Sequence, residues 1–361
     1  MTRAVFNNVR MSGMLTVVPS GRIKLDDEIR FYENNQVKLE RLKTTVGLSE
    51  RAVADENTTP GDMMFFAAKN LIEGMGIDVN TIDAVICVTD MPDYKCPPTA
   101  CVIHGRLGLP VKCMAFDINQ GCAGYVYGLY VAHAMIESGG CNRILLLVGD
   151  AKTHTIDVRD RVSAPIFGDG AAATIVERAS NCVPAYFSIG ADGEKFENIM
   201  IPAGGARNPY TVDSMVAVPD EYGNIRAPVN FRMNGRAVFD FTMNVVPGNI
   251  SDCISFAGIS VDDIDYFVLH QANKSIIENI VRRLGVSDMA RVPTQTLGKI
   301  GNLAVASIPS AICDVLCEVV SGETKRVLLS GFGVGLSFAT AVVELGNIYC
   351  SHILEYKGEN K

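Results

Sequence analysis

Short apolar runs alternate with helix-length segments along most of this chain. Six of these runs are four to seven residues long and rich in Val, Ile, Leu and Ala, which is typical of buried strands. They are Ala84–Thr89, Ile144–Gly149, Ala171–Val176, Tyr266–Leu269, Val327–Ser330 and Ala339–Leu345. Longer apolar segments such as Tyr125–Ile136 predict helices between them. The alternation predicts an α/β protein whose sheets are mostly buried.

The chain also resembles itself at a spacing of about 180 residues, far beyond the 20 to 50 residues of solenoid repeats. Thr81–Ile86 resembles Asp263–Val268, and Asn142–Leu146 resembles Lys325–Leu329. This spacing indicates a duplicated domain rather than a repeat array. We therefore expect two similar halves that share one interface.

The predicted halves cover residues 1–177 and 178–361. Three polar residues in distinctive runs fall on opposite sides of this boundary: Cys122 in the first half, His270 and Asn302 in the second. Packing of the halves about a pseudo-twofold axis would bring all three to a cleft between them, where small-molecule sites often form.

Cys122 stands just ahead of the apolar segment Tyr125–Ile136, between Gly121 and Gly124. At a helix N-terminus, unpaired backbone N–H groups and the helix dipole favour a thiolate over a thiol. The pattern therefore predicts a nucleophile. The alternative is a buried packing cysteine, since most of the 11 cysteines lie in apolar runs where a free thiol behaves as a small hydrophobe.

His270 and Asn302 are candidates for the second half of a thioester reaction. His270 follows the strand Tyr266–Leu269 and precedes the predicted helix Lys274–Leu284, so it lies at a strand's carboxyl end, the usual position of active residues in α/β sheets. Asn302 precedes a helix that begins near Val305. Together they offer two polar donors for a developing oxyanion or enolate. The alternatives are a hydrogen-bonded core histidine and a turn or cap asparagine.

Composition narrows the class of protein. With 48% hydrophobic and 20% charged residues over 361 positions, the chain has the balance of a folded globular protein. A net charge of −8 argues against a surface that binds nucleic acid. The odd cysteine count and the lack of a CxxC pair predict neither a disulfide framework nor a metal site. The N-terminus does not resemble a signal peptide, and no uncharged run approaches the roughly 18 residues of a membrane span, so we expect a cytoplasmic protein with no membrane partner.

Several runs together resemble β-ketoacyl-acyl-carrier-protein synthase III of the thiolase superfamily. In chain order these are Gln120–Gly124, Phe167–Ala172, His270–Asn273, Gly301–Asn302 followed by Ala306–Pro309, and Gly331–Gly335. The resemblance spans roughly residues 45–345. It implies a five-layered αβαβα fold of two pseudo-repeated halves, usually in a homodimer.

The resemblance also implies a reaction. Cys122 takes an acyl group from an acyl-thioester, and His270 and Asn302 bind the thioester oxygen of a malonyl-type second substrate while carbon dioxide leaves. The product is a β-ketoacyl thioester. Backbone N–H groups of Cys122, Val334 and Gly335 are the implied oxyanion hole for acyl transfer. The substrates are thioesters of coenzyme A or of acyl carrier protein, and no metal or organic cofactor is implied.

Three positions depart from the family at or near expected substrate contacts. The family commonly clamps the coenzyme A adenine between a tryptophan and an arginine, but this chain has no tryptophan and the matching positions are Arg41 and His154. Cys96 stands where many relatives place a phenylalanine that closes the partner subunit's acyl tunnel, which suggests room for a longer or bulkier acyl group. Arg236 and Asn273 are further implied substrate contacts.

The implied carrier-docking surface is also altered. Ser275 replaces the arginine that usually follows the His-Gln-Ala-Asn run, and Asp240 stands near the position of a docking lysine. Lys274, Arg282 and Arg283 remain as candidates for contacts with an acidic carrier protein. The alternative is that these three side chains form an ordinary solvated helix face.

The departures suggest a specialised lipid or secondary-metabolite pathway more than general fatty-acid initiation. Two other activities stay open. One keeps the nucleophile but transfers the acyl group to a hydroxyl or amine, or condenses without loss of carbon dioxide. The other is a non-catalytic partner subunit of an active synthase, against which the intact Cys-His-Asn set argues.

Overall fold

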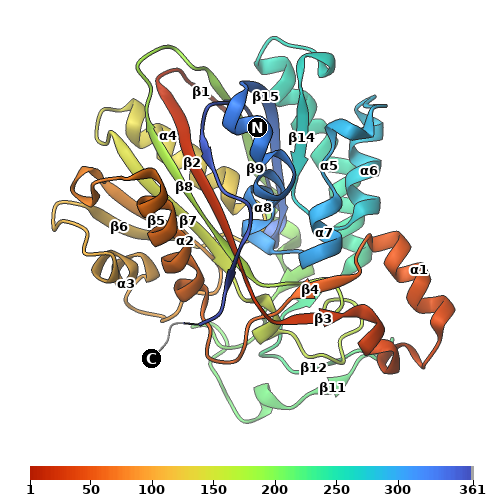
Figure 1. Cartoon of the computed structure of the whole chain (residues 1–361). Coiled ribbons are helices and arrows are strands. Elements are labelled where there is room, and N and C mark those ends of the chain that lie inside the picture. The colour runs from red at the N-terminus through yellow and green to blue at the C-terminus, as the bar shows by residue number, and fades with distance from the viewer. Residues whose placement is uncertain (359–361) are drawn as a thin grey trace.

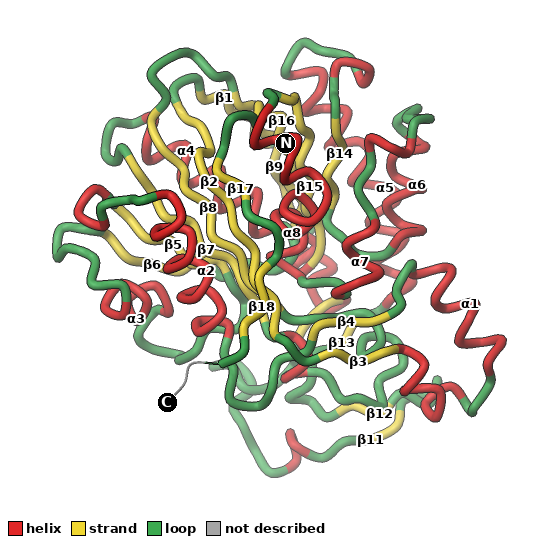
Figure 2. The backbone as a smooth tube through the Cα atoms, in the orientation of Figure 1, coloured by secondary structure: helices red, strands yellow, loops and turns green. Residues whose placement is uncertain are grey.

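The computed structural model describes residues 1–358, which form two β-sheets with helices between and around them (Figures 1 and 2). The first sheet has seven strands: β2 (Val9–Pro19), β5 (Ala84–Val88), β6 (Met114–Ile118), β7 (Arg143–Asp150), β8 (Gly170–Arg178), β17 (Tyr349–Cys350) and β18 (Leu354–Tyr356). The second has five: β1 (Thr2–Phe6), β9 (Ala185–Ala191), β14 (Tyr266–Leu269), β15 (Lys325–Gly333) and β16 (Ser337–Leu345). All six predicted strands coincide with these elements, except that Thr89 lies one residue beyond the end of β5.

The two sheets share one topology. Four strands run in the order β2-β8-β7-β5 in the first and β9-β16-β15-β14 in the second. In each, the last two strands of that order are parallel and the other neighbours are antiparallel. The internal resemblance of the sequence therefore corresponds to a repeated sheet. The terminal strands cross over: β1 joins the second sheet, whereas β17 and β18 join the first. The division at residue 177 stays a prediction about folding units.

Helices complete the five layers of the predicted αβαβα fold (Figure 1). The α-helices are α1 (Gln36–Val46), α2 (Pro60–Met75), α3 (Thr99–Arg106), α4 (Gly124–Glu137), α5 (Gly235–Phe256), α6 (Lys274–Arg283), α7 (Gln295–Ile300), α8 (Ser307–Ala311) and α9 (Cys317–Gly322). α2 and α3 cover the outer side of the first sheet, and α5 and α6 that of the second. α4 and α8 contact strands of both sheets and form the middle layer.

The composition of α4 explains its central place. Its sequence carries no charged residue before Glu137, and Tyr125 and Leu129 are completely buried. A helix that is apolar on all sides must be covered on all sides. Because both sheets cover α4, the residues just before its first turn, Cys122 among them, lie between the halves.

A second middle-layer helix is unusually apolar. The helical segment Ala304–Gly322 is long and apolar enough to cross a membrane, although Asp314 and Glu318 interrupt its apolar run. In this fold 72% of its most apolar stretch is buried inside the protein. The segment is thus explained as a core helix.

Short strand pairs lie near the carboxyl ends of the parallel strands. They include β3 (Arg22–Lys24) with β4 (Glu50–Ala52), β10 (Ile199–Met200) with β13 (Arg232–Met233), and the hairpin of β11 (Val218–Pro219) and β12 (Ile225–Arg226). The short helices are η1 (Leu25–Tyr32), η2 (Val79–Thr81), η3 (Lys152–Thr155), η4 (Gly193–Asn198), η5 (Asp213–Met215), η6 (Val261–Asp263), η7 (Met289–Arg291), η8 (Ala304–Ala306), the π-helical turn η9 (Ile312–Leu316) and η10 (Val334–Leu336). These helices are spread over the molecule, and η2 and η6 precede the amino ends of β5 and β14. Several of the short strands and helices wall the cavities described below.

A backbone bridge joins the two halves at this end. The N–H of Gly168 donates to the carbonyl of Asn302 at 3.0 Å, and the N–H of Asn302 donates to the carbonyl of Ile166 at 3.0 Å. Gly168 permits this contact because a Cβ there would lie 2.2 Å from the carbonyl oxygen of Ile300 and 3.0 Å from that of Ala52. Both oxygens belong to the backbone and cannot rotate away as the end of a flexible side chain could.

We expect Gly168→Ala to destabilise the protein by about 1–3 kcal/mol, the usual cost of overpacking a tight site. The matched control is Gly248→Ala inside α5, where an added Cβ meets no atom within 4 Å. That change should stabilise the helix by up to ~1 kcal/mol. Thermal unfolding followed by circular dichroism compares the two variants. Equal melting temperatures would show that the bridge tolerates a side chain.

Candidate active site

A cavity of about 160 Å³ brings together Cys122, His270 and Asn302. The first comes from the loop before α4, the second from the end of β14 and the third from the loop between α7 and η8. Most of the other lining side chains are apolar: Val162, Ile166, Phe167, Ile199, Phe231, Met233, Val238, Ala272, Ile276, Phe332 and Val334. A polar set in an apolar cavity is the usual composition of a small-molecule site.

Cys122 lies two residues before the start of α4 and is almost fully buried. The end of β15 passes directly beside it: a Cβ on Gly333 would lie 3.0 Å from the Cys122 Sγ. The sulfur therefore faces backbone on one side and the cavity on the other.

Burial raises the pKa of Cys122 to about 12. The ammonium of Lys152 acts in the opposite direction, whereas the carboxylates of Asp90 and Asp150 add to the increase. The expectation that the helix N-terminus favours a thiolate is therefore wrong for the resting site, because desolvation of the sulfur outweighs the backbone N–H groups. Cys122 rests as a neutral thiol.

His270 is held on several sides. Its backbone N–H donates to the carbonyl of Ser330 at 2.8 Å, its ring packs edge-on against Phe332, and its Nδ1 lies 2.6 Å from the Ser307 Oγ. Burial lowers the pKa of His270 to about 3, against the opposing effect of the Ala304 backbone. The imidazole is therefore neutral near pH 7, and Nε2 is the ring nitrogen left for a ligand.

Asn302 is oriented by its own turn. Its Oδ1 accepts a hydrogen bond from the N–H of Ala304 at 2.9 Å. The flanking backbone is unusual, with φ of 81° at Gly301 and 47° at Ala304, which is in the left-handed region that L-residues rarely adopt. Because Oδ1 is engaged, the Nδ2 amide is the arm of the side chain that can donate to a ligand.

This arrangement suits covalent chemistry followed by anion stabilisation. A thiol can accept an acyl group, and two neutral donors in a dry cavity can stabilise negative charge where it develops. Both donors are uncharged, so they attract a substrate in its ground state only weakly. Their hydrogen bonds become stronger when negative charge develops in the transition state.

The predicted oxyanion-hole residues of the loop after β15 differ in their position relative to the cavity. Val334 lines the cavity, together with Phe332 and Gly333, whereas Gly335 lies one residue beyond the lining segment. Gly333, which contacts Cys122, belongs to the Phe332–Gly335 loop whose backbone the family resemblance implies as part of the oxyanion hole.

The predicted substrate-binding residues lie at different depths. Asn273 lines the cavity and caps α6, its Oδ1 accepting from the N–H of Ile276 at 2.8 Å. Arg236, in the first turn of α5, lines a neighbouring cavity. Arg41, His154 and Cys96 are exposed residues of α1, η3 and the loop before α3.

The neighbouring cavity has a volume of about 660 Å³ and shares Val162, Met233 and Gly235 with the first. Many of its other lining residues are charged: Glu197, Asp220, Glu221, Arg226, Arg232 and Arg236. A polar outer chamber therefore adjoins the apolar inner one.

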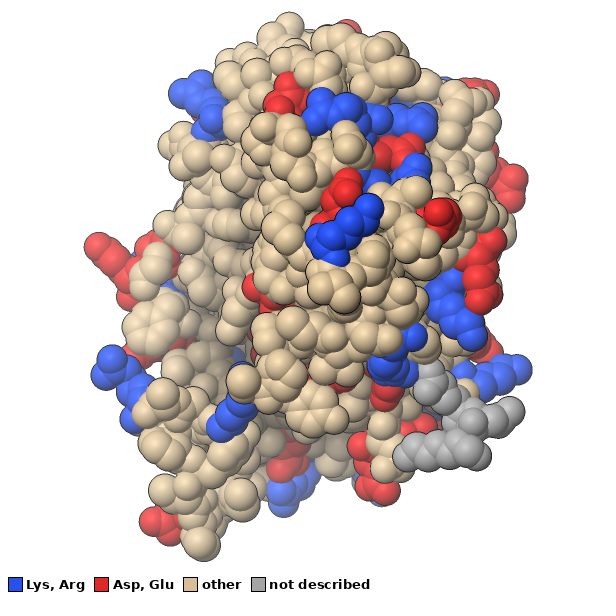
Figure 3. All heavy atoms as spheres, turned by 90° about the vertical axis from the view of Figure 1, so that its left-hand side faces the viewer, with Lys and Arg blue, Asp and Glu red and all other residues tan. Residues whose placement is uncertain are grey.

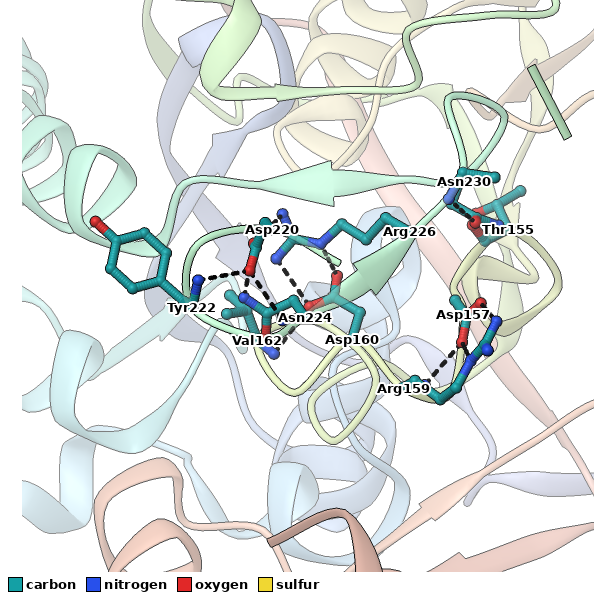
Figure 4. A network of polar contacts seen from close by, with 11 residues as sticks. Thr155, Asp157, Arg159, Asp160, Val162, Asp220, Tyr222, Asn224, Arg226 and Asn230 are labelled. Carbon is teal, nitrogen blue, oxygen red and sulfur yellow. Dashed lines mark hydrogen bonds and ion pairs between the residues drawn. The ribbon is translucent and has the colours of Figure 1, made fainter. Parts of the chain in front are cut away.

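An ion-pair network holds the wall between the chambers (Figure 4). The guanidinium of Arg226, on β12, pairs with the completely buried Asp160 through two contacts of 2.8 and 2.9 Å. The Oδ1 of Asp160 also accepts from the N–H of Val162 at 3.0 Å. This bidentate pairing ties the hairpin to the segment that lines both chambers.

The three predicted carrier-docking residues do not form one patch. Lys274 begins α6, lies against Gly47 at the end of α1 and pairs with Glu278 at 3.8 Å. Arg282 and Arg283 end the same helix, about 12 to 13 Å further along its axis. Arg283 also donates to the carbonyl of Met243 at 2.6 Å.

Two polar features were missed from the sequence. Lys152 lines the cavity although it stands in a polar run that reads as a surface loop. Ser307 contacts His270, a pairing that joins residues 37 positions apart and carries no local pattern. Among the described residues, Cys317, Glu318 and His352 could share a metal ion, their ligand atoms lying within 4.8 Å of one another, but they do not line the cavity.

Comparisons with known proteins identify the family of the chain. The N-terminal and C-terminal family models of 3-oxoacyl-[acyl-carrier-protein] synthase III match residues 116–193 and 254–345. A Campylobacter jejuni protein provisionally named 3-oxoacyl-[acyl-carrier-protein] synthase 3 is 36% identical over 98% of this chain and 99% of its own length. A β-ketoacyl-[acyl-carrier-protein] synthase III of Roseiflexus is 35% identical over 93% of this chain and 98% of its own.

Solved structures give the same result. A 3-oxoacyl-(acyl-carrier protein) synthase from Burkholderia xenovorans superposes with a TM-score of 0.91 at 33% identity, covering 98% of this chain and 99% of its own. The priming β-ketosynthase of the R1128 polyketide pathway superposes with a TM-score of 0.80 at 26% identity, covering 94% and 97%. The chain therefore belongs to the 3-oxoacyl-[acyl-carrier-protein] synthase III family, a family of acyltransferases with the thiolase fold.

Proposed function

We propose that this acyltransferase forms an acyl-Cys122 intermediate and condenses it with a malonyl-type thioester, with loss of carbon dioxide. The observation that carries the proposal is the single cavity in which Cys122 of one half meets His270 and Asn302 of the other. The chemistry needs a nucleophile and a separate pair of donors, and the cavity offers both.

In the first step the Cys122 sulfur attacks the carbonyl carbon of the donor thioester. A new C–S bond forms, the donor's C–S bond breaks, and the thiol proton ends on the departing thiol. The backbone beside the sulfur, at Cys122 and in the Phe332–Val334 segment, supplies the candidate N–H donors for the oxyanion of this step.

In the second step the thioester oxygen of the malonyl-type substrate lies against the His270 Nε2 and Asn302 Nδ2 groups. The Nδ1 of His270 lies 2.6 Å from the Ser307 Oγ. In the proposed step the hydroxyl donates to Nδ1, so the ring carries its proton on Nε2. Loss of carbon dioxide leaves an enolate stabilised by these two donors, and its carbon attacks the acyl-Cys122 carbonyl. The β-ketoacyl product leaves as a thioester and the thiol is regenerated. The chemistry uses neither a metal nor an organic cofactor.

The donors are thioesters of coenzyme A or of acyl carrier protein. The outer chamber, with Arg232 and Arg236 in its lining, suits the phosphate-bearing arm that both donors share. Arg41 and His154 are exposed and available for an adenine, and Arg282 with Arg283 for an acidic carrier. Cytoplasmic localisation fits the free state of all eleven cysteines, each of which lies in the described part of the chain.

The assembly we propose is a homodimer through the edge of the first sheet. β6 is the last strand of that sheet, and the residues around it include the exposed apolar side chains of Tyr94, Val111 and Met114. The face on this side of the molecule carries large uncharged areas between scattered charged side chains (Figure 3). An open edge strand with apolar neighbours favours pairing with a second copy.

The pathway we propose is a specialised lipid or secondary-metabolite route. The likeness to a priming ketosynthase of a polyketide pathway supports it, as do the altered substrate positions Cys96 and His154. Malonyl-dependent release of carbon dioxide distinguishes this reaction from acyl transfer to a hydroxyl or amine.

Incubation with a mixture of acyl-coenzyme A and acyl-carrier donors should add one acyl group to the protein, seen by intact-mass spectrometry. Cys122→Ala should lose the adduct completely because the nucleophile is gone. Cys253→Ala is the matched control: Cys253 is also fully buried, and burial also raises its pKa to about 12. Acylation of the Cys122→Ala variant would refute the assignment of Cys122 as the nucleophile. A wild-type protein that no donor acylates would favour a non-catalytic subunit.

Replacing either His270 or Asn302 with Ala should preserve acyl loading but slow condensation by about 10²–10³-fold, the usual cost of one oxyanion donor. Product formation from a malonyl thioester, measured by mass spectrometry, separates this effect from loss of loading. Equal loss of loading in both variants would place these residues in the first step instead.

The decarboxylation step should be nearly independent of pH between 5 and 6.5. Because burial lowers the pKa of His270 to about 3, its neutral donor form persists throughout this range and is lost only as the pH falls toward that value. Carbon dioxide release by the Cys122→Ala variant isolates this step from acylation. A roughly tenfold fall across the range is the behaviour of an ordinary histidine, with its pKa near 6.5, and would contradict the assignment.

Cys96 should admit long acyl donors across the proposed dimer interface. Among acetyl through dodecanoyl donors, the wild type should turn over donors longer than acetyl. Cys96→Phe should reduce the turnover of the long donors at least tenfold while leaving the turnover of acetyl donors unchanged. Cys182→Phe, at another exposed cysteine, is the control for added surface bulk. Strict preference of the wild type for acetyl would count against a widened tunnel.

A further inference from the structure

A charged group that the proposed reaction does not use lines the inner chamber. Lys152 is only 1% exposed, yet it contributes to the same cavity wall as Cys122. Its ammonium pairs with the carboxylate of Asp90 and lies 4.0 Å from that of Asp150. Asp150 is completely buried and accepts from the hydroxyl of Thr89 at 2.9 Å. A lysine and an aspartate thus lie out of water beside an apolar chamber, and a second, partly buried aspartate pairs with the lysine.

The sheet explains why these groups meet Cys122. β7, β5 and β6 are adjacent and parallel, so their carboxyl ends share one edge. Lys152 follows β7 by two residues, Asp90 follows β5 by two, and Cys122 follows β6 by four. Asp90 reaches the nucleophile's own loop: a Cβ on Gly121 would lie 3.1 Å from its Oδ2.

The surroundings hold Lys152 in position. The N–H of its neighbour Thr153 donates to the buried carboxylate of Asp169 at 3.0 Å, which fixes the start of η3. The ammonium also lies over the ring of Phe231, 5.5 Å from its centre, on another wall of the chamber. A flexible side chain is therefore confined to one place.

A purely structural role explains this cluster poorly. Burying two or three charges costs desolvation energy that their attraction only partly offsets, and replacing buried ion pairs with apolar side chains is often neutral or stabilising. Buried charges are more often retained where they act on chemistry. Here the adjacent chemistry is the conversion of a neutral thiol into a nucleophile.

We propose that Lys152 is a positioning residue for acyl transfer, whose ammonium, held by Asp90 and Asp150, stabilises negative charge on the Cys122 sulfur as it attacks. This deepens the proposed function and rests on it. The bonds made and broken are those of the first step described above, and Lys152 neither gains nor loses a proton overall.

The charges around the sulfur support this role and determine whether each group raises or lowers the pKa of the thiol. The charged groups that face Cys122 are Lys152, Asp90 and Asp150, while His270 across the chamber is neutral. Burial acts to lower the pKa of Lys152, but Asp150 and Asp90 together raise it above the ordinary value, so its charge persists. Burial raises the pKa of Asp150 to about 7.

The test uses two variants with opposite predicted effects. Lys152→Met removes the positive charge and should raise the apparent pKa of the Cys122 thiol. Asp90→Asn removes a negative charge at nearly unchanged shape and should lower it. Loss of packing alone would not move the two variants in opposite directions, so the sign of each shift reports electrostatics.

The measurement is the rate of iodoacetamide alkylation at Cys122 from pH 7 to 10, with the modified peptide assigned by mass spectrometry. At pH 8 we expect Lys152→Met to react about tenfold more slowly, the equivalent of one pKa unit, and Asp90→Asn to react severalfold faster. Lys69→Met, the same change at an exposed position on α2, should match the wild type.

Shifts of both variants in the same direction, or no shift in either, would overturn the proposal. Should Lys152→Met not fold, an unchanged or slower rate in Asp90→Asn would overturn it by itself, and a faster rate would support it. Alkylation requires no acyl donor or acceptor. A protein that no thioester acylates but that shows the opposed shifts would therefore refute the proposed reaction and retain the electrostatic role of Lys152.

Discussion

The geometry of the site depends on the backbone bridge between Asn302 and the Ile166–Gly168 loop. Its two hydrogen bonds, each 3.0 Å long, join a loop of the first half to the loop that carries a donor of the second. Backbone bonds are short and directional, so they set the separation of the halves more closely than side-chain packing alone could. The turn that orients Asn302 begins at this bridge and continues into the strained φ of Ala304. The strain is retained because the halves meet on either side of it.

A second constraint is the dryness of the chamber. Burial raises the pKa of Cys122 and lowers that of His270, so both groups are neutral at rest. Under the proposed reaction, the cysteine and the bound substrate carry negative charge only while bonds are changing, when fixed donors act most strongly because little water competes with them. The same dryness makes the neutral thiol a poor nucleophile by itself. A reaction that uses neutral donors for its second step would therefore need positive charge for its first, and Lys152 places a cation in the chamber wall.

The features that could be predicted from the sequence are those marked by a periodic hydrophobic pattern or by an internal sequence repeat. The buried strands, the apolar helix α4 and the pairing of the two halves all follow from patterns that extend over many residues. Short edge strands could not be found this way: β17 has two residues, and its partner β2 begins about 340 positions earlier. The charge state of Cys122 was predicted wrongly because a helix start is visible in a sequence whereas the depth of burial is not. Lys152 was missed for the same reason, since its polar neighbours Thr153 and His154 suggest an exposed turn.

The residues proposed to tune this enzyme separate into two kinds by location. Cys96, Arg41 and His154 are exposed, and under the proposed function they lie where a donor or a second copy would be met. Lys152 and Asp90 form an ion pair inside the protein, where each charge must be accommodated by the fold. An exposed residue changes at little cost in stability, whereas a buried ion pair requires both partners and their neighbours together. The exposed residues therefore bear on the proposed choice of acyl chain, whereas the inner pair bears on the proposed acyl transfer itself.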